Sequence, residues 1–288
     1  MVKNNKMPAI RFSGYTEAWE QRMLLTVLNK IVDYRGRTPK KLGLDWSPTG
    51  HLALSALNVK MGYVDKTIDA HYGDDHLYSV WMKDNDLYEG QVLFTTEAPM
   101  GNVAQVPDNN KYILSQRTIA FVPDRSVISD NFLAVVLSAS KCQKSLINRA
   151  SGGTAKGVSQ KTLSEISLDI PQSLSEQDKV SELIKKLSKI ITLHQRKLEK
   201  LKLTKKALLQ KLFPQNGSKI PELRFKGFTD AWKQCKLGDL AEIVRGASPR
   251  PISDPKWFDN NSNVGWLRIA DVTAQDGRIR YLDRKSVV

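Results

Sequence analysis

Cysteine is scarce in this chain, with two residues, Cys142 and Cys235, among 288. These two cysteines lie in different units of the chain, so they form neither the disulfide framework of a small secreted domain nor the closely spaced ligand pair of a structural zinc site. Histidine is also rare, and the cluster His71–His76 has no further group of ligand types to complete a metal site. No apolar run approaches the roughly 20 residues of a membrane-spanning helix, and the polar N-terminus lacks the apolar core of a signal peptide. We therefore expect a cytoplasmic, globular protein with no metal, no cofactor and no membrane partner.

The motifs of common catalytic sites are absent as well. The sequence contains no dinucleotide-binding G-x-G-x-x-G, no Walker motif, no zinc-binding H-E-x-x-H and no hydrolase G-x-S-x-G. It also lacks the Asn/Asp-Pro-Pro-aromatic tetrad with which adenine methyltransferases hold a base. We predict no catalytic residues, although the dispersed carboxylates of a nuclease would leave little trace in a sequence.

What the chain does contain is a long internal repeat. Residues 8–21 return as residues 221–234, with eight of fourteen positions identical and an offset of 213 residues. That offset is far longer than the 20–50 residues of a solenoid repeat and matches a whole domain with its connector. The sequence predicts one complete unit followed by the beginning of a second. It favours two domains that share one architecture and recognise different ligands. The alternative is a duplication whose two copies have diverged in sequence without acquiring different functions.

Glycine and proline are absent from residues 175–212, which predicts one long helix with Ser175 as its N-cap and a stop at Phe213-Pro214. Its apolar residues follow the heptad spacing of a coiled coil. The predicted seam consists of Val180, Ile184, Leu187, Ile191, His194, Leu198, Leu201, Lys205, Leu208 and Leu212. The chain offers no second helix of this length. We therefore expect the seam to pair with another chain, and antiparallel self-association is one such pairing.

The charge is uneven. The formal net charge is +14, and residues 174–220 carry 12 Lys+Arg against 4 Asp+Glu. Such a balance favours a polyanionic partner, although a solvated lysine-rich helix face would produce the same count.

Residues 23–172 alternate short apolar runs with Gly and Pro turns, which predicts a single mixed α/β (α+β) domain with a twisted sheet. The predicted strands are Leu52–Val59, Gln91–Thr96, Asn102–Val106, Thr118–Val122 and Ile166–Ile170, and the predicted helix is Asp130–Ala150.

Four polar stretches of this domain are candidates to face a ligand. They are Arg35–Lys41, Phe94–Ala104, Ser115–Thr118 and the glycine-rich Ser151–Gln160. Arg pairs with guanine edges and Gln with adenine edges, whereas Lys and Thr contact phosphates. On the family resemblance described in the next paragraph, the predicted DNA-binding residues of these stretches are Arg35, Arg37, Lys40, Lys41, Thr95, Thr96, Gln116, Arg117 and Lys156. Solvated basic loops and a purely structural pairing of Gln116 and Arg117 are the alternatives.

A resemblance to a known family is carried by the repeated residues 8–21 and 221–234, together with Gly90–Ala104, Ser115–Arg117 and Gly152–Gln177. On these segments the sequence resembles the specificity (S) subunit of a type I restriction–modification system. The resemblance implies a sequence-specific DNA-binding subunit without catalysis of its own. In that family two target-recognition domains each read half of a split double-stranded DNA target, and long helices hold them apart. The implied partners are methyltransferase (M) subunits and, through the complex, restriction (R) subunits.

The resemblance also implies a division of the chain. Residues 1–173 would form the first target-recognition domain, 174–213 the spacer helix, 214–235 a linker with the repeat opening, and 236–288 a partial second recognition domain. We expect this second domain to be incomplete, through truncation, a recombining cassette or a fragmentary sequence. The alternatives are a nuclease or methyltransferase in its own right and a coiled-coil adaptor that binds only protein.

Overall fold

The computed structural model describes residues 7–68, 71–150, 157–246, 248, 250–252, 254–259, 261–275, 278 and 285–286. By its internal contacts the chain divides into two units, residues 1–201 and residues 202–288. Within the described ranges, no helix combines the length and the apolar character needed to cross a lipid bilayer.

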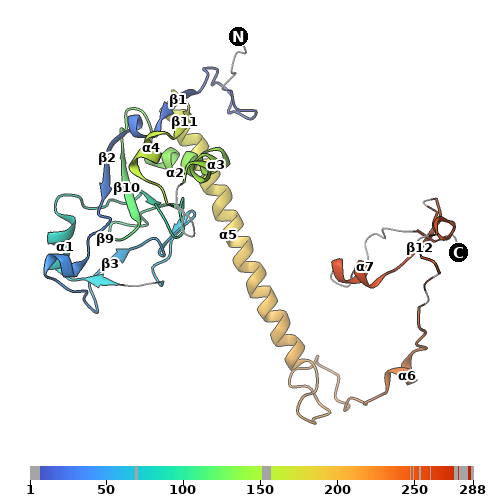
Figure 1. The fold of residues 1–288 in the computed structure, drawn as a ribbon. Coiled ribbons are helices and arrows are strands. Elements are labelled where there is room, and N and C mark those ends of the chain that lie inside the picture. The colour runs from blue at the N-terminus through green and yellow to red at the C-terminus, as the bar shows by residue number, and fades with distance from the viewer. Residues whose placement is uncertain are drawn as a thin grey trace. The chain divides into compact units, whose positions relative to one another are not determined.

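The first unit is built from short strands that gather around the start of a long helix (Figure 1). The strands are β1 (Glu20–Met23), β2 (Leu28–Asp33), β3 (His51–Leu54), β4 (Val59–Lys60), β5 (Tyr63–Val64), β6 (Tyr72–Gly73), β7 (Val92–Thr95), β8 (Val103–Gln105), β9 (Tyr112–Leu114), β10 (Thr118–Pro123) and β11 (Ser167–Ile170). The helices are α1 (Asp75–Met82), α2 (Asp130–Ser138), α3 (Ser140–Arg149), α4 (Gln160–Ser164) and α5 (Leu174–Lys211), with 3-10 turns η1 (Leu24–Val27) and η2 (Pro39–Leu42).

A four-stranded antiparallel sheet of order β2-β10-β7-β8 forms the centre of this unit. A second sheet of order β6-β3-β9 lies beside it and contains one parallel pair, β3 with β9. Two ribbons, β1-β11 and β4-β5, complete the unit. The β1-β11 ribbon joins the N-terminal segment to the strand that leads into α5.

The central sheet is buried on both faces because successive side chains of a strand point to opposite sides. In β7, Val92 and Phe94 belong to one apolar core and Leu93 to the other. In β10, Phe121 faces the first core and Ala120 the second. Strands covered on both faces carry continuous apolar runs, which is why the sequence shows them as unbroken hydrophobic segments.

The mixed α/β class with a long following helix is confirmed. The strands expected near β7, β8, β10 and β11 are all present. The strand predicted over Leu52–Val59 ends at Leu54, because the Asn58 side chain accepts hydrogen bonds from the Ser55 backbone and hydroxyl and closes a turn. The single helix predicted over Asp130–Ala150 is wrong. Ala139 takes an extended conformation (ψ 142°) and separates α2 from α3.

The long helix is confirmed as α5, Leu174–Lys211. Its predicted N-cap is wrong, because the hydroxyl of Ser173, not that of Ser175, accepts a hydrogen bond from the backbone N–H of Glu176. Ser175 instead shares a hydrogen bond with Tyr15 at 3.0 Å. From residue 182 to residue 211 every residue of the helix is exposed.

One buried ion pair fixes the first turn of α5 to the N-terminal segment. Arg11 donates from Nε to Oε1 and from Nη2 to Oε2 of Glu176, both at 2.8 Å. Trp19 adds a third donor, its indole N–H, 3.2 Å from Oε1. The side chains of Arg11 and Glu176 are 12% and 2% exposed. These contacts join segments 165 residues apart in sequence.

Gln177 fixes the same turn to the rest of the first unit. Its Oε1 accepts from the backbone N–H of Ser129 at 3.0 Å, and its Nε2 donates to the carbonyls of Val127 (2.9 Å) and Pro171 (3.0 Å). Gln177 is wholly buried, so each of these bonds satisfies a polar group that water does not reach.

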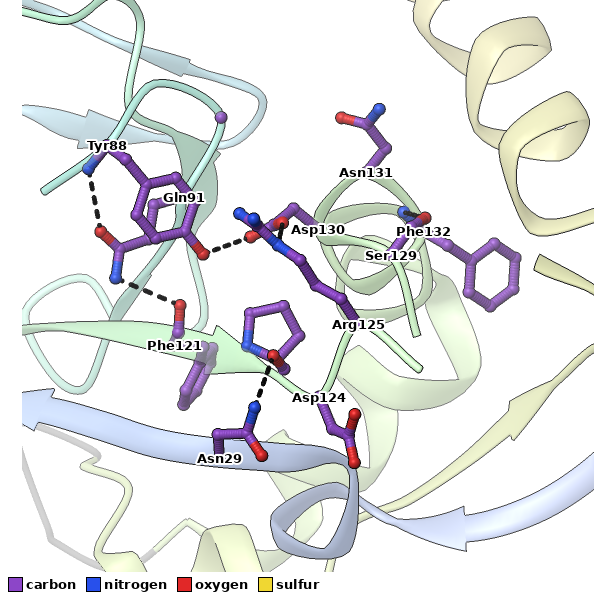
Figure 2. A network of polar contacts seen from close by, with 12 residues as sticks. Asn29, Tyr88, Gln91, Phe121, Asp124, Arg125, Ser129, Asp130, Asn131 and Phe132 are labelled. Atoms are coloured by element: carbon purple, nitrogen blue, oxygen red, sulfur yellow. Dashed lines mark hydrogen bonds and ion pairs between the residues drawn. The ribbon is translucent and has the colours of Figure 1, made fainter. Parts of the chain in front are cut away.

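A polar network continues this attachment around the start of α2 (Figure 2). Asp130 accepts hydrogen bonds from the Tyr88 hydroxyl at 2.7 Å and from Arg125 Nε at 3.1 Å. Burial, followed by the hydrogen bond to Asp130, raises the pKa of Tyr88. On the next residue, Asn131 accepts from Lys185 of α5 at 2.5 Å. The helix therefore leaves the domain in a fixed direction.

The described residues of the second unit contain α6 (Leu237–Leu240), the 3-10 turn η3 (Pro255–Trp257), β12 (Val264–Gly265), α7 (Ile269–Ala274) and β13 (Lys285–Ser286). Both apolar cores found among the described residues lie in the first unit. Between residues 233 and 275, Asp271 is the one described residue that is buried. The domain boundaries and the partial second recognition domain stay predictions.

We predict that Gln177→Ala lowers the free energy of unfolding of the first unit by about 2 kcal/mol or more. The substitution leaves one buried carbonyl and two partly buried backbone groups without their partner, and a fully buried group of this kind costs about 1–3 kcal/mol. Gln195→Ala on the exposed part of α5 is the matched control and should change stability by no more than about 0.5 kcal/mol. Urea unfolding of both variants measures the difference, and equal stabilities would show that Gln177 does not hold the helix.

Candidate nucleic-acid interface

The turn between β9 and β10 presents the two most exposed of the predicted base-reading residues. Gln116 and Arg117 are both exposed on this turn. Arg117 has a φ of +63°, in the left-handed region that residues with a Cβ rarely adopt. Backbone strain of this kind costs about 1–2 kcal/mol and persists where the surrounding structure enforces it.

Thr96 supplies that enforcement. Its backbone N–H and its hydroxyl both donate to the carbonyl of Arg117, at 2.8 and 3.2 Å. The side chain of Arg117 pairs with Glu97, with Nε 2.8 Å from Oε1. The two side chains are 53% and 41% exposed, so this is a surface ion pair of small net energy. The backbone of Arg117 is held firmly while its guanidinium remains accessible.

Thr95 shapes the loop that carries Glu97. It is wholly buried, and its hydroxyl accepts from the backbone N–H of Asn102 at 2.9 Å. The loop turns at Gly101, whose φ is +86° and whose carbonyl accepts from Gln143 at 2.9 Å. A Cβ at Gly101 would lie 3.0 Å from the Gln143 side-chain oxygen, which favours glycine at this position.

The side chain of Arg35 already makes hydrogen bonds within the protein, so fewer of its donors remain for a ligand. Its guanidinium pairs with both carboxylate oxygens of Asp33, and its Nη1 donates to the carbonyl of Val158 at 3.3 Å. Burial pushes the pKa of Asp33 upward, but the hydrogen bonds and positive charge of Arg35 outweigh it, and the pKa lies below its usual range. The same hydrogen bonds to Asp33 raise the pKa of Arg35, and the negative charge of Glu97 makes a smaller contribution in the same direction.

The basic loop after Arg35 divides into a structural and an exposed part. Arg37 donates to the carbonyl of Trp81 at 2.6 Å, near the end of α1, and stacks over Tyr34 at 4.2 Å. Lys40 and Lys41 are exposed on η2, and Lys41 donates from Nζ to the carbonyl of Gly36 within its own loop.

Two of the other predicted stretches contact Gly157-Val158, in the described part of the glycine-rich stretch Ser151–Gln160. Arg35 donates to the carbonyl of Val158, Val158 donates its N–H to the carbonyl of Thr96, and Gly157 forms a β-bridge with Glu97. Arg117 is connected to this segment through its contacts with Thr96 and Glu97. Thr95 and Thr96 are buried and offer no hydroxyl to solvent. Lys156 lies outside the described residues.

Sequence reasoning missed the acidic partners in this region. Asp33 stands two residues before Arg35, a spacing that brings the pair onto one side of a strand end, and this was the available signal. Glu97 lies within the predicted stretch but was assigned no role. The roles of Arg11 and Trp19 were also missed, although both are among the identical positions of the internal repeat.

The predicted helix seam has one buried end and a long exposed remainder. Val180 packs against the first core. The remaining apolar seam residues before residue 212 are each between 40% and 56% exposed, and they are Ile184, Leu187, Ile191, Leu198, Leu201 and Leu208. His194 is exposed as well. In the part of the chain that is described, no three His, Cys, Asp or Glu side chains are placed to hold a metal ion.

Comparison with known proteins finds a family model and solved structures to which parts of this chain are similar. Residues 76–203 match the family described as the type I restriction modification DNA specificity domain. The S subunit of a type I restriction–modification system from M. genitalium aligns over 73% of this chain and 48% of its own, with 12% identity and a TM-score of 0.47. The S (HsdS) subunit from Thermoanaerobacter tengcongensis aligns over 72% and 47%, with 16% identity and a TM-score of 0.45.

A chain from a structure concerned with complex assembly and conformational transition of the type I R-M system aligns over 68% of this chain and 45% of its own. Its identity is 14% and its TM-score 0.46. The chain thus spans about half the length of the solved structures that it matches.

We predict that Asp33→Asn lowers the free energy of unfolding by about 1–3 kcal/mol at pH 7, because Arg35 loses a charged acceptor. The folded-state pKa of Asp33 is depressed, so its contribution is complete above the unfolded value near 3.9 and is lost as the pH falls through the folded pKa. The gap between wild type and variant should therefore shrink below about pH 4. Urea unfolding from pH 7 to pH 3 measures it, with exposed Asp45→Asn as control. A constant gap would contradict the ion pair.

Proposed function

We propose, because residues 76–203 match the type I restriction modification DNA specificity domain, that this chain is a DNA-recognition subunit. It binds double-stranded DNA at one half of a split target and directs methyltransferase subunits, and through them restriction subunits, to that site. It performs no catalysis of its own, and it acts in the cytoplasm. The family match is the observation that carries the proposal.

The geometry of the β9-β10 turn supports a role in base recognition. Arg117 presents a guanidinium that matches the two acceptors of a guanine edge, and Gln116 an amide that matches adenine. Two hydrogen bonds from Thr96 fix the backbone beneath them. On binding, Arg117 exchanges its surface ion pair with Glu97 for a base or a phosphate at little cost.

The other predicted residues divide by what their side chains already contact. Lys40 and Lys41 are exposed and suit phosphate contacts, which position the protein without reading sequence. Arg35, Arg37, Thr95 and Thr96 support the reading surface from beneath through the contacts described above. Lys156 is retained as a phosphate contact on sequence grounds alone.

The exposed stripe of α5 suits a protein partner. At about 1.5–3 kcal/mol for each fully buried side chain, its six exposed apolar seam residues would yield at most about 9–18 kcal/mol. Association costs about 4–15 kcal/mol, a range that overlaps this upper bound, so we expect pairing of modest affinity. We expect an antiparallel pair of two α5 helices, with basic residues outside the seam available to DNA or to the methyltransferase subunits.

For DNA binding, we predict that Arg117→Ala costs about 1–3 kcal/mol of affinity for the target and relaxes one position of the sequence. The double variant Lys40→Ala, Lys41→Ala should weaken all DNA sequences alike and flatten the salt dependence. The complex co-purified with its methyltransferase partner is used to map methylated adenines, and fluorescence anisotropy at two salt concentrations then measures affinity. An unchanged methylation pattern for Arg117→Ala would exclude it as a base reader.

For self-association, we predict that the chain forms dimers at micromolar concentration and that Ile191→Glu shifts it to monomer. The charge would be buried in an apolar seam, where an unpaired carboxylate is costly. Thr192→Glu, next to it but outside the seam, introduces the same charge and should leave the dimer intact. Light scattering coupled to size exclusion distinguishes the outcomes, and a monomeric wild type would exclude the pairing.

A further inference from the structure

The two repeat openings place an arginine and a tryptophan at the same spacing. Arg11 and Trp19 in the first correspond to Arg224 and Trp232 in the second. In the first opening both side chains donate to Glu176 in the first turn of α5. The first opening is therefore a receptor for a glutamate at the beginning of a helix.

In the second opening the same residue types line an apolar pocket of about 300 Å³. Its wall includes Leu212 and Phe213 at the end of α5, and Phe228 of the repeat. Trp232 packs edge-on against Phe213, with ring centroids 5.6 Å apart. All of these residues lie in the second unit.

Backbone hydrogen bonds hold this pocket in place. Leu223 donates its N–H to the carbonyl of Lys211 at 2.9 Å, and Trp232 donates its N–H to the carbonyl of Lys219 at 2.8 Å. Lys211 and Glu222 add an ion pair at 2.5 Å. The repeat opening is therefore folded back against the residues that end the helix, within one unit.

Arg224 differs from Arg11 in one respect. Its Nη1 is buried and makes no hydrogen bond to any described residue. A guanidinium stays charged in proteins, and a buried charged donor without an acceptor is unfavourable. In the first opening the acceptor for the corresponding arginine is a carboxylate.

We propose that the Arg224 pocket receives the first turn of a partner helix that carries a glutamate, as Leu174–Gln177 does for Arg11. The carboxylate pairs with Arg224, and the apolar wall covers the adjoining helix residues. Glu176 of this chain is not the occupant, because its side chain is 2% exposed and already bound by Arg11. The assignment does not depend on DNA binding.

The two receptors differ in what they accept beside the glutamate. Tyr15 shares a hydrogen bond with Ser175 in the first opening, whereas Phe228 stands at the equivalent position of the second and has no hydroxyl. The Arg224 pocket therefore takes a helix start in which an apolar residue replaces that serine, without loss of a hydrogen bond.

The test uses the full chain and a synthetic acetylated peptide with the sequence of residues 171–190. We expect saturable binding by calorimetry, weakened about tenfold or more by Glu176→Gln in the peptide and equally by Arg224→Gln in the protein. Arg224→Lys, which keeps the charge but loses the paired donors, should fall between. Ser175→Ala in the peptide should not weaken binding, and Arg245→Gln, at an exposed position of the second unit, is the matched control.

Each outcome decides the proposal. Absence of saturable binding at millimolar peptide overturns it, as does binding that Arg224→Gln or the Glu176→Gln peptide leaves unchanged. If the protein instead self-associates in a way that Arg224→Gln abolishes, the occupant is a second copy that exchanges its own helix start, and the partner-helix assignment is wrong. Loss of DNA binding with intact peptide binding would overturn only the DNA-recognition proposal.

Discussion

A buried carboxylate at the start of α5 determines how the first unit is assembled. Glu176 is held by Arg11 and Trp19, and Gln177 beside it is held by backbone groups of the first unit. Removing one partner of a buried ion pair leaves an uncompensated charge, so the pair acts as a unit. The N-terminal segment, the sheet and the helix share this junction, and the direction of the helix follows from it.

The candidate DNA-binding surface at the β9-β10 turn also combines exposed side chains with a backbone that buried residues hold in place. Arg117 is strained, exposed and weakly paired, whereas Thr96 below it is buried and doubly hydrogen-bonded. Arg35 is tied to Asp33 and Val158. Side chains that contact a ligand need free donors, and the residues that position them use theirs internally. The structure thus distinguishes exposed side chains, such as that of Arg117, from internally bonded ones of the same type, such as that of Arg35.

Local patterns in the sequence predicted the long helix and most of the central strands, because heptad spacing and apolar runs report burial directly. They did not predict that Thr95 and Thr96 are buried, because the groups that cover them come from residue 102 and residue 117. Ser175 was chosen as helix cap over Ser173 because both have the right chemistry, and Tyr15, which engages Ser175, lies 160 residues away. Contacts across such separations leave no local signal.

The double-sided burial of the central sheet constrains how such a protein can change its target. A one-residue insertion in β7 or β10 would exchange the side chains of two cores, with Phe94 moving into the place built for Leu93. The turns at Arg117 and after Pro39 carry no such penalty. Insertions and substitutions are therefore expected to be tolerated better in these connections than in the strands that both cores constrain.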